Sequence, residues 1–495
     1  MAGMTTVQAK TFESLNPATD EVVGVHPVNS AEEVRAAVES ARAAAAWWGA
    51  LGFAGRLERL NRWKAALTRR AHELADVVHA ETGKPHGDAM LEIVLAIDHT
   101  AWAAKNARKV LGPKRRPAGL LMANQKATVE YQPLGVVGVI GPWNYPVFTP
   151  MGSIAYALAA GNAVVFKPSE YTPGVGRWLA ESFADAVPEH PVFRVVTGFG
   201  ETGAALCRSG VAKIAFTGSP GTGRKIMAAC AETLTPVLIE AGGKDALLVD
   251  ADADLDAAAE AAVWGAMSNA GQTCTGVERV YVHERVYDDF VAKVTAQARP
   301  LKVGFDADAQ VGPITMPGQI DIIRRHIADA LSRGARALTG GPVPEGSRYV
   351  EPTVLVDVPE DSAAVREETF GPTMTVTRVR DMDQAVDLAN ATAYGLGGTV
   401  FARARGLELA RRLRAGMVSV NSVISFAGVP SLPFGGVGES GFGRIHGPEG
   451  LREFARAKAI TTQRFRAPIT MTTFARTPKV DAQVAKLITF LHGRR

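Results

Sequence analysis

The feature that most limits how this chain can fold is an alternation of short apolar runs and helical segments between residues 135 and 240. Five β-branched runs follow one another, GVVGVI, NAVVFK, FRVVT, AKIAF and PVLIE, and a segment of helical composition separates each from the next. Neighbouring parallel strands require a crossover of this kind, and strands buried on both faces are apolar throughout. We therefore predict an α/β fold with a doubly wound parallel sheet.

The segments on either side extend this pattern. Residues 30–72 and 87–109 have helical composition, and Ser30 followed by Glu33 predicts a capping box at the start of the first helix. After the glycines of EAGGK (240–244) the alternation of strands and helices resumes. This second half indicates a further α/β domain.

The C-terminal tail has a helical pattern of its own. Val480, Val484 and Ile488 recur at four-residue spacing, with leucines beside them. Two interpretations stay open: the tail helix packs on its own protein or a second subunit, which we favour, or it lies on a membrane surface.

Composition and charge exclude several classes of protein. The net charge of +4 is spread over 495 residues, which is too dilute to indicate nucleic-acid binding. The three cysteines, Cys207, Cys230 and Cys274, form no CxxC pair, so we expect no disulfide framework, no metal site and a reducing compartment. No apolar run approaches the ~18 residues that span a bilayer, and the N-terminus lacks the features of a signal peptide. We therefore expect a cytoplasmic protein without a transmembrane segment.

Two side chains are candidates for nucleophile and base. Cys274 stands in NAGQTCTG, among small residues after a helix, which is the setting of an accessible thiol. Glu240 ends the apolar run PVLIE and precedes two glycines, so its carboxylate should lie at the carboxyl edge of the sheet, where open α/β sheets bind ligands. A general base could stand there.

Three further strand ends carry residues suited to ligands. Asn144 follows the first run, in GPWNYP, and its amide can donate to a developing oxyanion. Lys167 and Glu170, in KPSE, follow the second run and suit ribose hydroxyls. The segment FTGSPGTG (216–223) opens a helix whose free N–H groups can face phosphate. A GxGxxG beginning at Gly198 lacks the acidic residue that normally accompanies it, so alone it is a weak signal.

These motifs occur in a familiar order. GPWNYP, KPSE, FTGS, EAGGK, GQTC, EETFGP and PFGG appear at nearly the spacing seen in the aldehyde dehydrogenase superfamily, which the chain resembles from about residue 16 to residue 460. The resemblance is to the hydrolytic, non-acylating type. It implies an aldehyde dehydrogenase-like fold in four parts: a Rossmann-type cofactor-binding domain (1–114 and 134–242), an α/β catalytic domain (243–450), a β-hairpin oligomerisation arm (115–133 and 451–470) and a helical C-terminal tail (471–495).

The same resemblance implies the chemistry. Cys274 would attack an aldehyde to give a thiohemiacetal and, after oxidation, a thioester, and Asn144 would bind the oxyanion. Glu240 would activate the water that releases the carboxylic acid. The arm would build homodimers or homotetramers.

The resemblance also implies a nicotinamide cofactor. Lys167 and Glu170 would hold the adenosine ribose, Ser219 the pyrophosphate and Glu368 the nicotinamide ribose. The Glu170 carboxylate favours NAD because it would repel a 2′-phosphate, with NADP as the alternative. The GxGxxG is not required. The implied cofactor-binding residues are Trp143, Lys167, Ser169, Glu170, Gly218, Ser219, Gly223, Glu368 and Phe370.

The substrate is less well indicated. Relatives that act on succinate semialdehyde commonly carry arginines where this chain has Gly152 and Ser268, so an acidic aldehyde is disfavoured. Phe148, Met151 and Phe426 would give an apolar mouth suited to uncharged aliphatic or aromatic aldehydes. Two other functions stay open: an acylating dehydrogenase that uses coenzyme A, which would not need Glu240, and a non-catalytic binding module.

Overall fold

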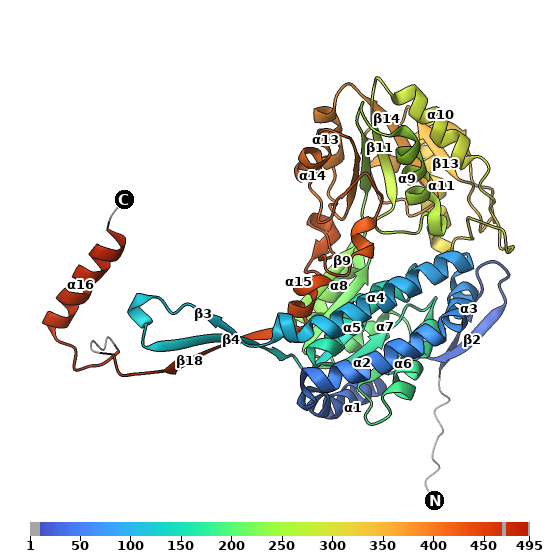
Figure 1. Ribbon diagram of the computed structural model, residues 1–495. Helices are drawn as coiled ribbons and strands as arrows, with labels where there is room; N and C mark the ends of the chain where they lie inside the picture. The colour runs from blue at the N-terminus through green and yellow to red at the C-terminus, as the bar shows by residue number, and fades with distance from the viewer. Residues whose placement is uncertain (1–9, 468–471, 494–495) are drawn as a thin grey trace, which may run out of the picture. The chain divides into compact units, whose positions relative to one another are not determined.

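The computed structural model describes residues 10–467 and 472–493, and Figure 1 labels their elements. The chain separates into two compact units, one of residues 1–111 and 133–456 and the other of residues 112–132 and 457–495. The predicted boundary at residue 242 falls inside the larger unit and stays a prediction. β17 (Gly441–Phe442) pairs with β9 (Val237–Ala241), so both halves of the larger unit contribute to one sheet.

The larger unit begins with a hairpin and a set of helices. The first helix starts at the predicted capping box, which is confirmed: Ser30 Oγ accepts from the Glu33 N–H at 3.3 Å, and Glu33 Oε2 accepts from the Ser30 N–H at 2.7 Å. The region predicted as helical from residue 30 to residue 72 is divided among three helices. These N-terminal elements are β1 (Thr11–Leu15), β2 (Val22–Pro27), α1 (Ala31–Ala50), α2 (Gly52–Arg69), α3 (Ala71–Thr82) and α4 (His86–Leu111).

The first large sheet contains the five predicted strands in parallel, in the order β9-β8-β5-β6-β7, with β17 antiparallel at the edge beside β9. The reversal of strand order around β5 is the doubly wound arrangement that the sequence predicts. Its other strands are β5 (Val136–Ile140), β6 (Ala163–Lys167), β7 (Phe193–Val195) and β8 (Lys213–Gly218), and its crossover helices are α5 (Phe148–Ala160), α6 (Pro173–Ala186), α7 (Gly200–Cys207) and α8 (Pro220–Ala231).

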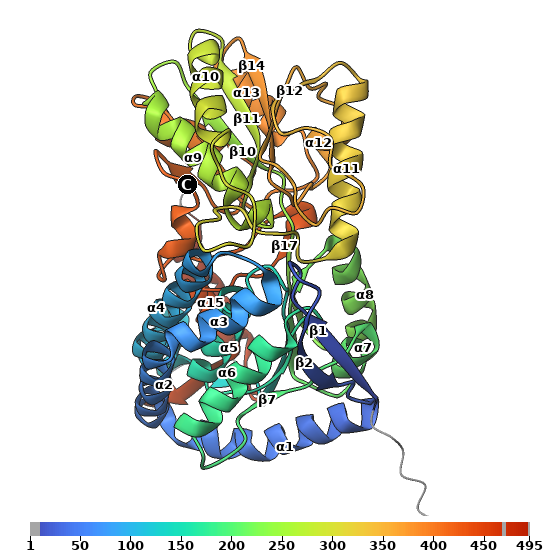
Figure 2. The same cartoon turned by 90° about the vertical axis from the view of Figure 1, so that its right-hand side faces the viewer.

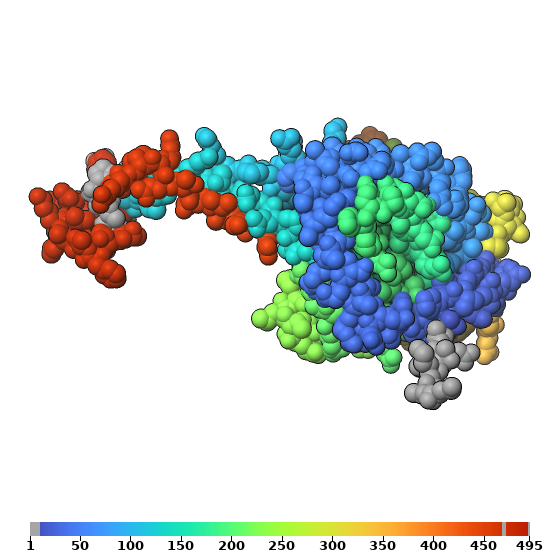
Figure 3. All heavy atoms as spheres, turned by 90° about the horizontal axis from the view of Figure 1, so that it is seen from below, coloured from blue at the N-terminus to red at the C-terminus, as the bar shows by residue number. Residues whose placement is uncertain are grey.

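Helices cover this sheet closely. Helix α1 contacts β5, β6 and β7, whereas α8 contacts β8 and β9 and lies beside α7, as Figure 2 shows. Figure 3 shows the surface on which the blue N-terminal helices lie against the green segment around α6, in agreement with contacts of α2 and α3 to α6.

The second large sheet has seven strands in the order β12-β13-β14-β11-β10-β15-β16, parallel except for the β12–β13 pair. The strands are β10 (Asp245–Val249), β11 (Val277–His283), β12 (Arg336–Thr339), β13 (Thr353–Val356), β14 (Thr373–Val379), β15 (Gly398–Phe401) and β16 (Ser419–Val420). The helices of this half are α9 (Leu255–Met267), α10 (Tyr287–Ala298), α11 (Pro317–Ser332), α12 (Ala363–Arg366), α13 (Met382–Asn390), α14 (Gly406–Arg412) and α15 (Gly447–Glu453).

The smaller unit is a three-stranded sheet and a helix. Its strand order is β18-β4-β3, and β3 and β4 are antiparallel. The elements are β3 (Lys114–Arg116), β4 (Gln125–Pro133), β18 (Ala455–Gln463) and α16 (Pro478–His492). Part of the predicted tail, residues 471 and 494–495, lies outside the described residues. In the described part of the chain, no helix is both long and apolar enough to cross a membrane.

Candidate active site

The carboxyl ends of β5, β6 and β8 meet at one edge of the first sheet. Ile140 pairs with Lys167 on one side and with Phe216 on the other, so the loops after these strands begin side by side. A cavity of about 820 Å³ opens at this edge, and Asn144, Lys167 and Cys274 all line it. The structure therefore brings the candidate nucleophile, from the second half of the chain, to the predicted edge of the first sheet.

The segment before Cys274 has an unusual backbone. Asn269, Ala270 and Gly271 have φ values of 51°, 54° and 69°, in the left-handed region. At Gly271 a Cβ would lie 2.0 Å from the Gly371 carbonyl oxygen, so only glycine fits there. Such a backbone persists only where its surroundings hold it.

A hydrogen-bond network holds this segment against the Asn144 loop. Asn144 Nδ2 donates to the Gln272 carbonyl at 2.8 Å, and Asn269 Nδ2 donates to the Asn144 carbonyl at 3.0 Å. On the other side, Asp88 Oδ2 accepts from the Asn269 N–H at 3.1 Å. Because a side-chain amide carries two N–H hydrogens, Asn144 keeps one donor beyond its bond to Gln272.

A buried ion pair, which the sequence analysis missed, supports the same loop. Lys84 Nζ lies 2.7 Å from Glu92 Oε1 and also donates to the Asn144 carbonyl at 2.6 Å. Glu92 Oε2 accepts from the N–H groups of Val147 and Phe148, at 3.0 and 3.1 Å, where α5 begins. Glu92 stands between Leu91 and Ile93 in a helical pattern, so its burial has no signal in the sequence alone.

Glu240 lies in β9, only 2% exposed. Burial raises its pKa to about 8, and a hydrogen bond from the Thr217 side chain partly opposes this shift. The side chain does not itself line the cavity, whereas the following residues, Ala241 and Gly242, do. A buried carboxyl group with a pKa near neutrality is typical of a general base.

Cys274 is partly exposed, whereas Cys207 and Cys230 are buried. Burial raises the pKa of the Cys274 thiol well above its usual value, and the nearby carboxylates of Glu240 and Glu368 raise it further. The thiol is therefore protonated at neutral pH in this arrangement, and it needs a base or an added positive charge to ionise.

Eight of the nine predicted cofactor residues line the cavity, and Gly223 does not. Gly223 is buried in α8, where Ile239 Cγ2 lies 3.2 Å from the place of a Cβ. By contrast Gly200 and Gly203, from the GxGxxG that was judged weak, do line the cavity. The sequence contains this motif, but the motif lacks the acidic residue that normally accompanies it, so it did not indicate a cofactor site.

The polar residues of the cavity are suited to a dinucleotide. Lys167 Nζ lies 3.5 Å from Glu170 Oε2, and Ser169 Oγ lies at the same distance from that oxygen. Ser219, the N-cap of α8, and Thr222 both line the cavity, and the Ser219 hydroxyl accepts from the Thr222 N–H, so the N-terminal end of this helix lies at the cavity. Helix N-termini of this kind bind phosphate.

Two aromatic rings and an acid complete the lining. Trp143 and Phe370 meet edge to face with centroids 5.6 Å apart. Glu368 Oε1 accepts from the Gly243 N–H at 3.0 Å, and burial raises the pKa of Glu368 to about 8. Gly242 is required here because a Cβ would collide with the Glu368 carboxylate, at 2.1 Å from the nearer oxygen.

A second buried ion pair, which the sequence did not predict, holds the loop that carries Phe370. Glu278 pairs with Lys244 and accepts from the N–H groups of Thr369 and Phe370. Lys244 Nζ also donates to the Thr369 hydroxyl at 3.1 Å. Lys244 therefore connects the loop after β9 to the loop that carries Phe370.

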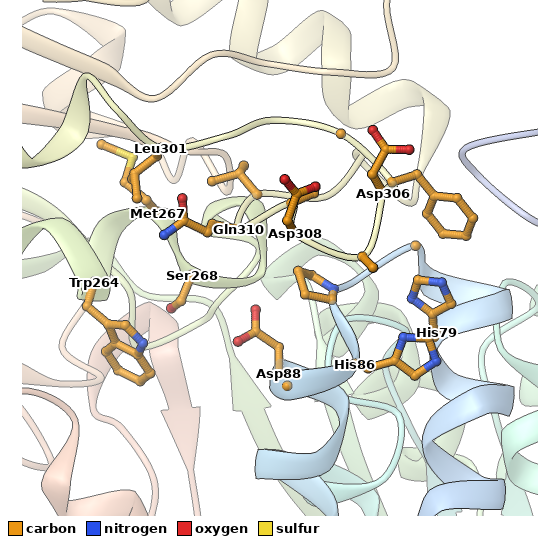
Figure 4. A pocket seen from close by; sticks show the side chains of 18 of the residues that line it. His79, His86, Asp88, Trp264, Met267, Ser268, Leu301, Asp306, Asp308 and Gln310 are labelled. Atoms are coloured by element: carbon orange, nitrogen blue, oxygen red, sulfur yellow. The ribbon is translucent and has the colours of Figure 1, made fainter.

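A second cavity, of about 950 Å³, adjoins the segment before Cys274. In Figure 4, Trp264 and Ser268 lie toward one end of this cavity, His79 and His86 lie at the other, and Asp88 lies between them. Its lining contains four carboxylates, Asp88, Glu260, Asp306 and Asp308, and neither lysine nor arginine. Lys302 pairs with Asp308, which leaves an excess of negative charge.

The residues predicted for an apolar substrate mouth are buried. Phe148, Met151 and Phe426 line neither of these two cavities, so their role stays a prediction. Gly152 lies beside His446, whose Nε2 is 2.6 Å from the place of a Cβ. A long side chain at residue 152 therefore has no room in this packing.

The chain is similar to known proteins over nearly its whole length. The model of the "Aldehyde dehydrogenase family" matches residues 4–460. A 4,4'-diapolycopene aldehyde oxidase of a Methylomonas species is 37% identical, and the match covers 92% of this chain and 87% of that protein. A glutarate-semialdehyde dehydrogenase of Pseudomonas aeruginosa is also 37% identical, and the match covers 91% of this chain and 93% of that protein. The solved NAD-dependent aldehyde dehydrogenase from Sinorhizobium meliloti has a TM-score of 0.89 and 34% identity, and the match covers 94% of this chain and 93% of that one.

Proposed function

The chain belongs to the aldehyde dehydrogenase family and is an NAD(P)-dependent enzyme of that class, and from this premise we propose that it oxidises an uncharged aldehyde to the carboxylic acid through a thioester on Cys274. The observation that carries the proposal is the hydrogen bond of Asn144 Nδ2 to the Gln272 carbonyl, at 2.8 Å, two residues before Cys274. This contact brings an amide donor and a thiol to one wall of the cavity.

The first step joins the Cys274 sulfur to the aldehyde carbon. The thiol loses its proton to a base as the C–S bond forms, and the carbonyl oxygen becomes an oxyanion. The second N–H of the Asn144 amide, together with backbone N–H groups beside Cys274, would stabilise that oxyanion. A nicotinamide dinucleotide, when bound, supplies the acceptor for the hydride that the thiohemiacetal carbon gives up.

The second step releases the product. Glu240, in its ionised form, takes a proton from a water molecule, which attacks the thioester carbon. The C–S bond breaks, the carboxylic acid leaves, and the thiol is restored. The burial of Glu240 and its raised pKa support this role, because a buried carboxylate with a pKa near neutrality accepts a proton readily.

We propose NAD as the preferred cofactor. Glu170 stands beside Lys167 at the end of β6, and an ionised carboxylate there would accept from a ribose hydroxyl but repel a 2′-phosphate. NADP is the alternative, since Lys167 and Lys225 also line the cavity.

The proposal of an uncharged substrate rests on residues 152 and 268, where an arginine could pair with a distal carboxylate and this chain has glycine and serine. Residue 268 is serine, and a side chain as long as arginine has no room at Gly152 in the present packing. The acidic cavity beside Ser268 would moreover repel an anionic aldehyde. Similar proteins differ on this point, because their names include a 4,4'-diapolycopene aldehyde oxidase as well as glutarate- and succinate-semialdehyde dehydrogenases.

Assembly and location belong to the same proposal. We propose a homodimer or homotetramer built through the smaller unit, in keeping with the family resemblance. We also propose a cytoplasmic location, because all three cysteines are free thiols, as is usual in a reducing compartment.

The test is the formation of reduced cofactor with NAD and, separately, NADP over aliphatic, aromatic and carboxylated aldehydes. Turnover that disappears in Cys274→Ala and persists in Cys230→Ala, a matched change of a buried thiol outside the cavity, supports the mechanism. Activity that appears only with coenzyme A would favour the acylating alternative. A clear preference for carboxylated aldehydes would overturn the substrate class but not the mechanism.

A further inference from the structure

The C-terminal tail, defined here as residues 464–495, differs in charge from the rest of the chain. It follows residue 460, where the match to the family ends. Asp481 is its only acidic residue, so its net charge is +6, whereas the whole chain has +4 and the preceding residues therefore have −2. Its basic residues are Arg464, Arg466, Arg476, Lys479, Lys486, Arg494 and Arg495.

The tail also carries apolar side chains at its surface. In α16, which Figure 1 places near the C-terminus, Val480, Val484, Leu487 and Leu491 follow one another at helical spacing along one face. These four side chains are half-buried, and none of the described residues of α16 is fully buried. Ile488 and Phe490 of the same helix are exposed. Phe474, before the helix, is fully exposed.

The charge and the apolar face lie on different sides of the helix. At 100° per residue, Lys479 and Lys486 fall within about 20° of each other and about 120° from the centre of the apolar stripe. The one carboxylate is already paired, because Arg476 Nε lies 2.8 Å from Asp481 Oδ1. The tail thus combines an apolar stripe with an uncompensated positive charge.

We propose that this tail binds the surface of a lipid bilayer that contains anionic lipids. A helix with this division inserts its apolar stripe at the boundary between headgroups and acyl chains, while lysine side chains extend toward the headgroups. Basic residues near such a surface strengthen binding through the negative surface potential. The proposal is independent of the enzyme's substrate.

Charge and composition favour this partner over two others. A second copy of the tail carries the same +6, so self-pairing would bring like charges together. A nucleic acid would use the positive charge but not an aliphatic stripe, since it is bound through phosphates and stacked bases. An anionic bilayer uses both features.

The experiment is sedimentation of the full-length enzyme with phosphatidylcholine vesicles, with and without phosphatidylglycerol. We expect binding only when phosphatidylglycerol is present, and weaker binding at high salt. Lys479→Gln with Lys486→Gln should lower the partition coefficient roughly 30-fold. The matched control, Lys105→Gln with Lys109→Gln, removes the same charge from exposed positions on α4 and should bind as the unmodified enzyme does.

A second pair of variants separates the apolar stripe from the charge. Val484→Asp and Ala485→Asp add the same charge to adjacent residues of α16, but only the first lies in the stripe. We expect Val484→Asp to abolish binding and Ala485→Asp to weaken it only modestly, while both keep the activity of the unmodified enzyme in solution. Equal binding of these two variants, binding that is indifferent to phosphatidylglycerol, or capture of RNA or of a second copy in place of vesicles would each overturn the proposal.

Discussion

At the scale of single residues, the ionisation of Glu240 should control the rate of product release. Burial raises its pKa to about 8, so at neutral pH most of the molecules carry the protonated form, which cannot accept a proton from water. Only the carboxylate is active as a base, and the active fraction grows as the pH rises. We therefore expect kcat to increase through about pH 8 and to level off above it, measured from about pH 6 to about pH 10.

The variant Glu240→Gln tests this assignment. It should lower kcat at least ~100-fold and remove the increase near pH 8, because the base is gone. A burst of reduced cofactor in the first turnover should remain, since formation of the thioester precedes the step that Glu240 serves. Glu351→Gln, at an exposed carboxylate, is the control and should keep the original pH profile. Loss of the burst in Glu240→Gln would instead assign Glu240 to activation of the thiol.

Residue positions were predictable where local sequence determines them. Lys167 ends β6, Ser219 directly follows β8 and Asn144 lies in the loop after β5, so the strand pattern alone brings them to one edge of the sheet. Asn269 and Lys84 were missed because their importance comes from contacts with residues far away in the chain, such as the Asn144 carbonyl. The pattern of residues within one segment does not indicate contacts with residues far away in the chain.

At the scale of elements, the Lys84–Glu92 pair should contribute strongly to the start of α5. Both side chains are almost completely buried, at 1% and 0% exposure. Glu92→Gln leaves the Lys84 ammonium without its anion and weakens the acceptor for the Val147 and Phe148 N–H groups. We expect the free energy of unfolding in urea to fall by about 3 kcal/mol.

Two further variants test whether the loss of stability comes from the buried Lys84–Glu92 pair. Glu408→Gln breaks an exposed pair with Arg405 at 2.9 Å and should cause no measurable change. Replacing both buried partners, as in Lys84→Met with Glu92→Met, should recover only the part of the loss that comes from the unpaired ammonium, because the Val147 and Phe148 N–H groups still lack their acceptor. If Glu92→Gln proves as stable as Glu408→Gln, the buried pair has no such role.

The elements themselves were predicted well where they are long and apolar. All five parallel strands of the first sheet were expected from their runs of β-branched residues. The sixth strand, β17, was missed because it has two residues, one of them a glycine, and exists only through its pairing with Ile239 and Glu240. Similarly, the region from residue 30 to residue 72 had helical composition throughout, and the break after Leu51 depends on Gly52, whose φ is 65°.

At the scale of the whole molecule, the two compact units show what sequence patterns leave open. The composition of residues 240–244 indicated a boundary between two domains, and two separate sheets do lie on either side of it. Compactness, however, depends on contacts across the chain, and β17 joins the second half to the first sheet. The pattern of residues along the sequence does not indicate that β17 pairs with β9.

The smaller unit supports the last prediction, that it mediates assembly. Leu120, Leu121 and Met122 are 64%, 52% and 51% exposed, at a turn between β3 and β4. Burial of a leucine side chain is worth ~1.5 kcal/mol or more, and each copy in a dimer would contribute two of them. We therefore expect Leu120→Ser with Leu121→Ser to raise the dissociation constant at least ~100-fold. Light scattering after size exclusion would measure it as a shift toward the monomer mass.

The matched control for this change is Leu407→Ser, in α14 of the larger unit. Leu407 is 60% exposed, so the substitution removes a similar apolar surface at a place where we expect no subunit contact. It should leave the oligomeric mass unchanged, because an exposed side chain that contacts nothing contributes nothing to association. A double variant that keeps the mass of the unmodified enzyme, or an unmodified enzyme that is already monomeric, would show that assembly does not depend on these leucines.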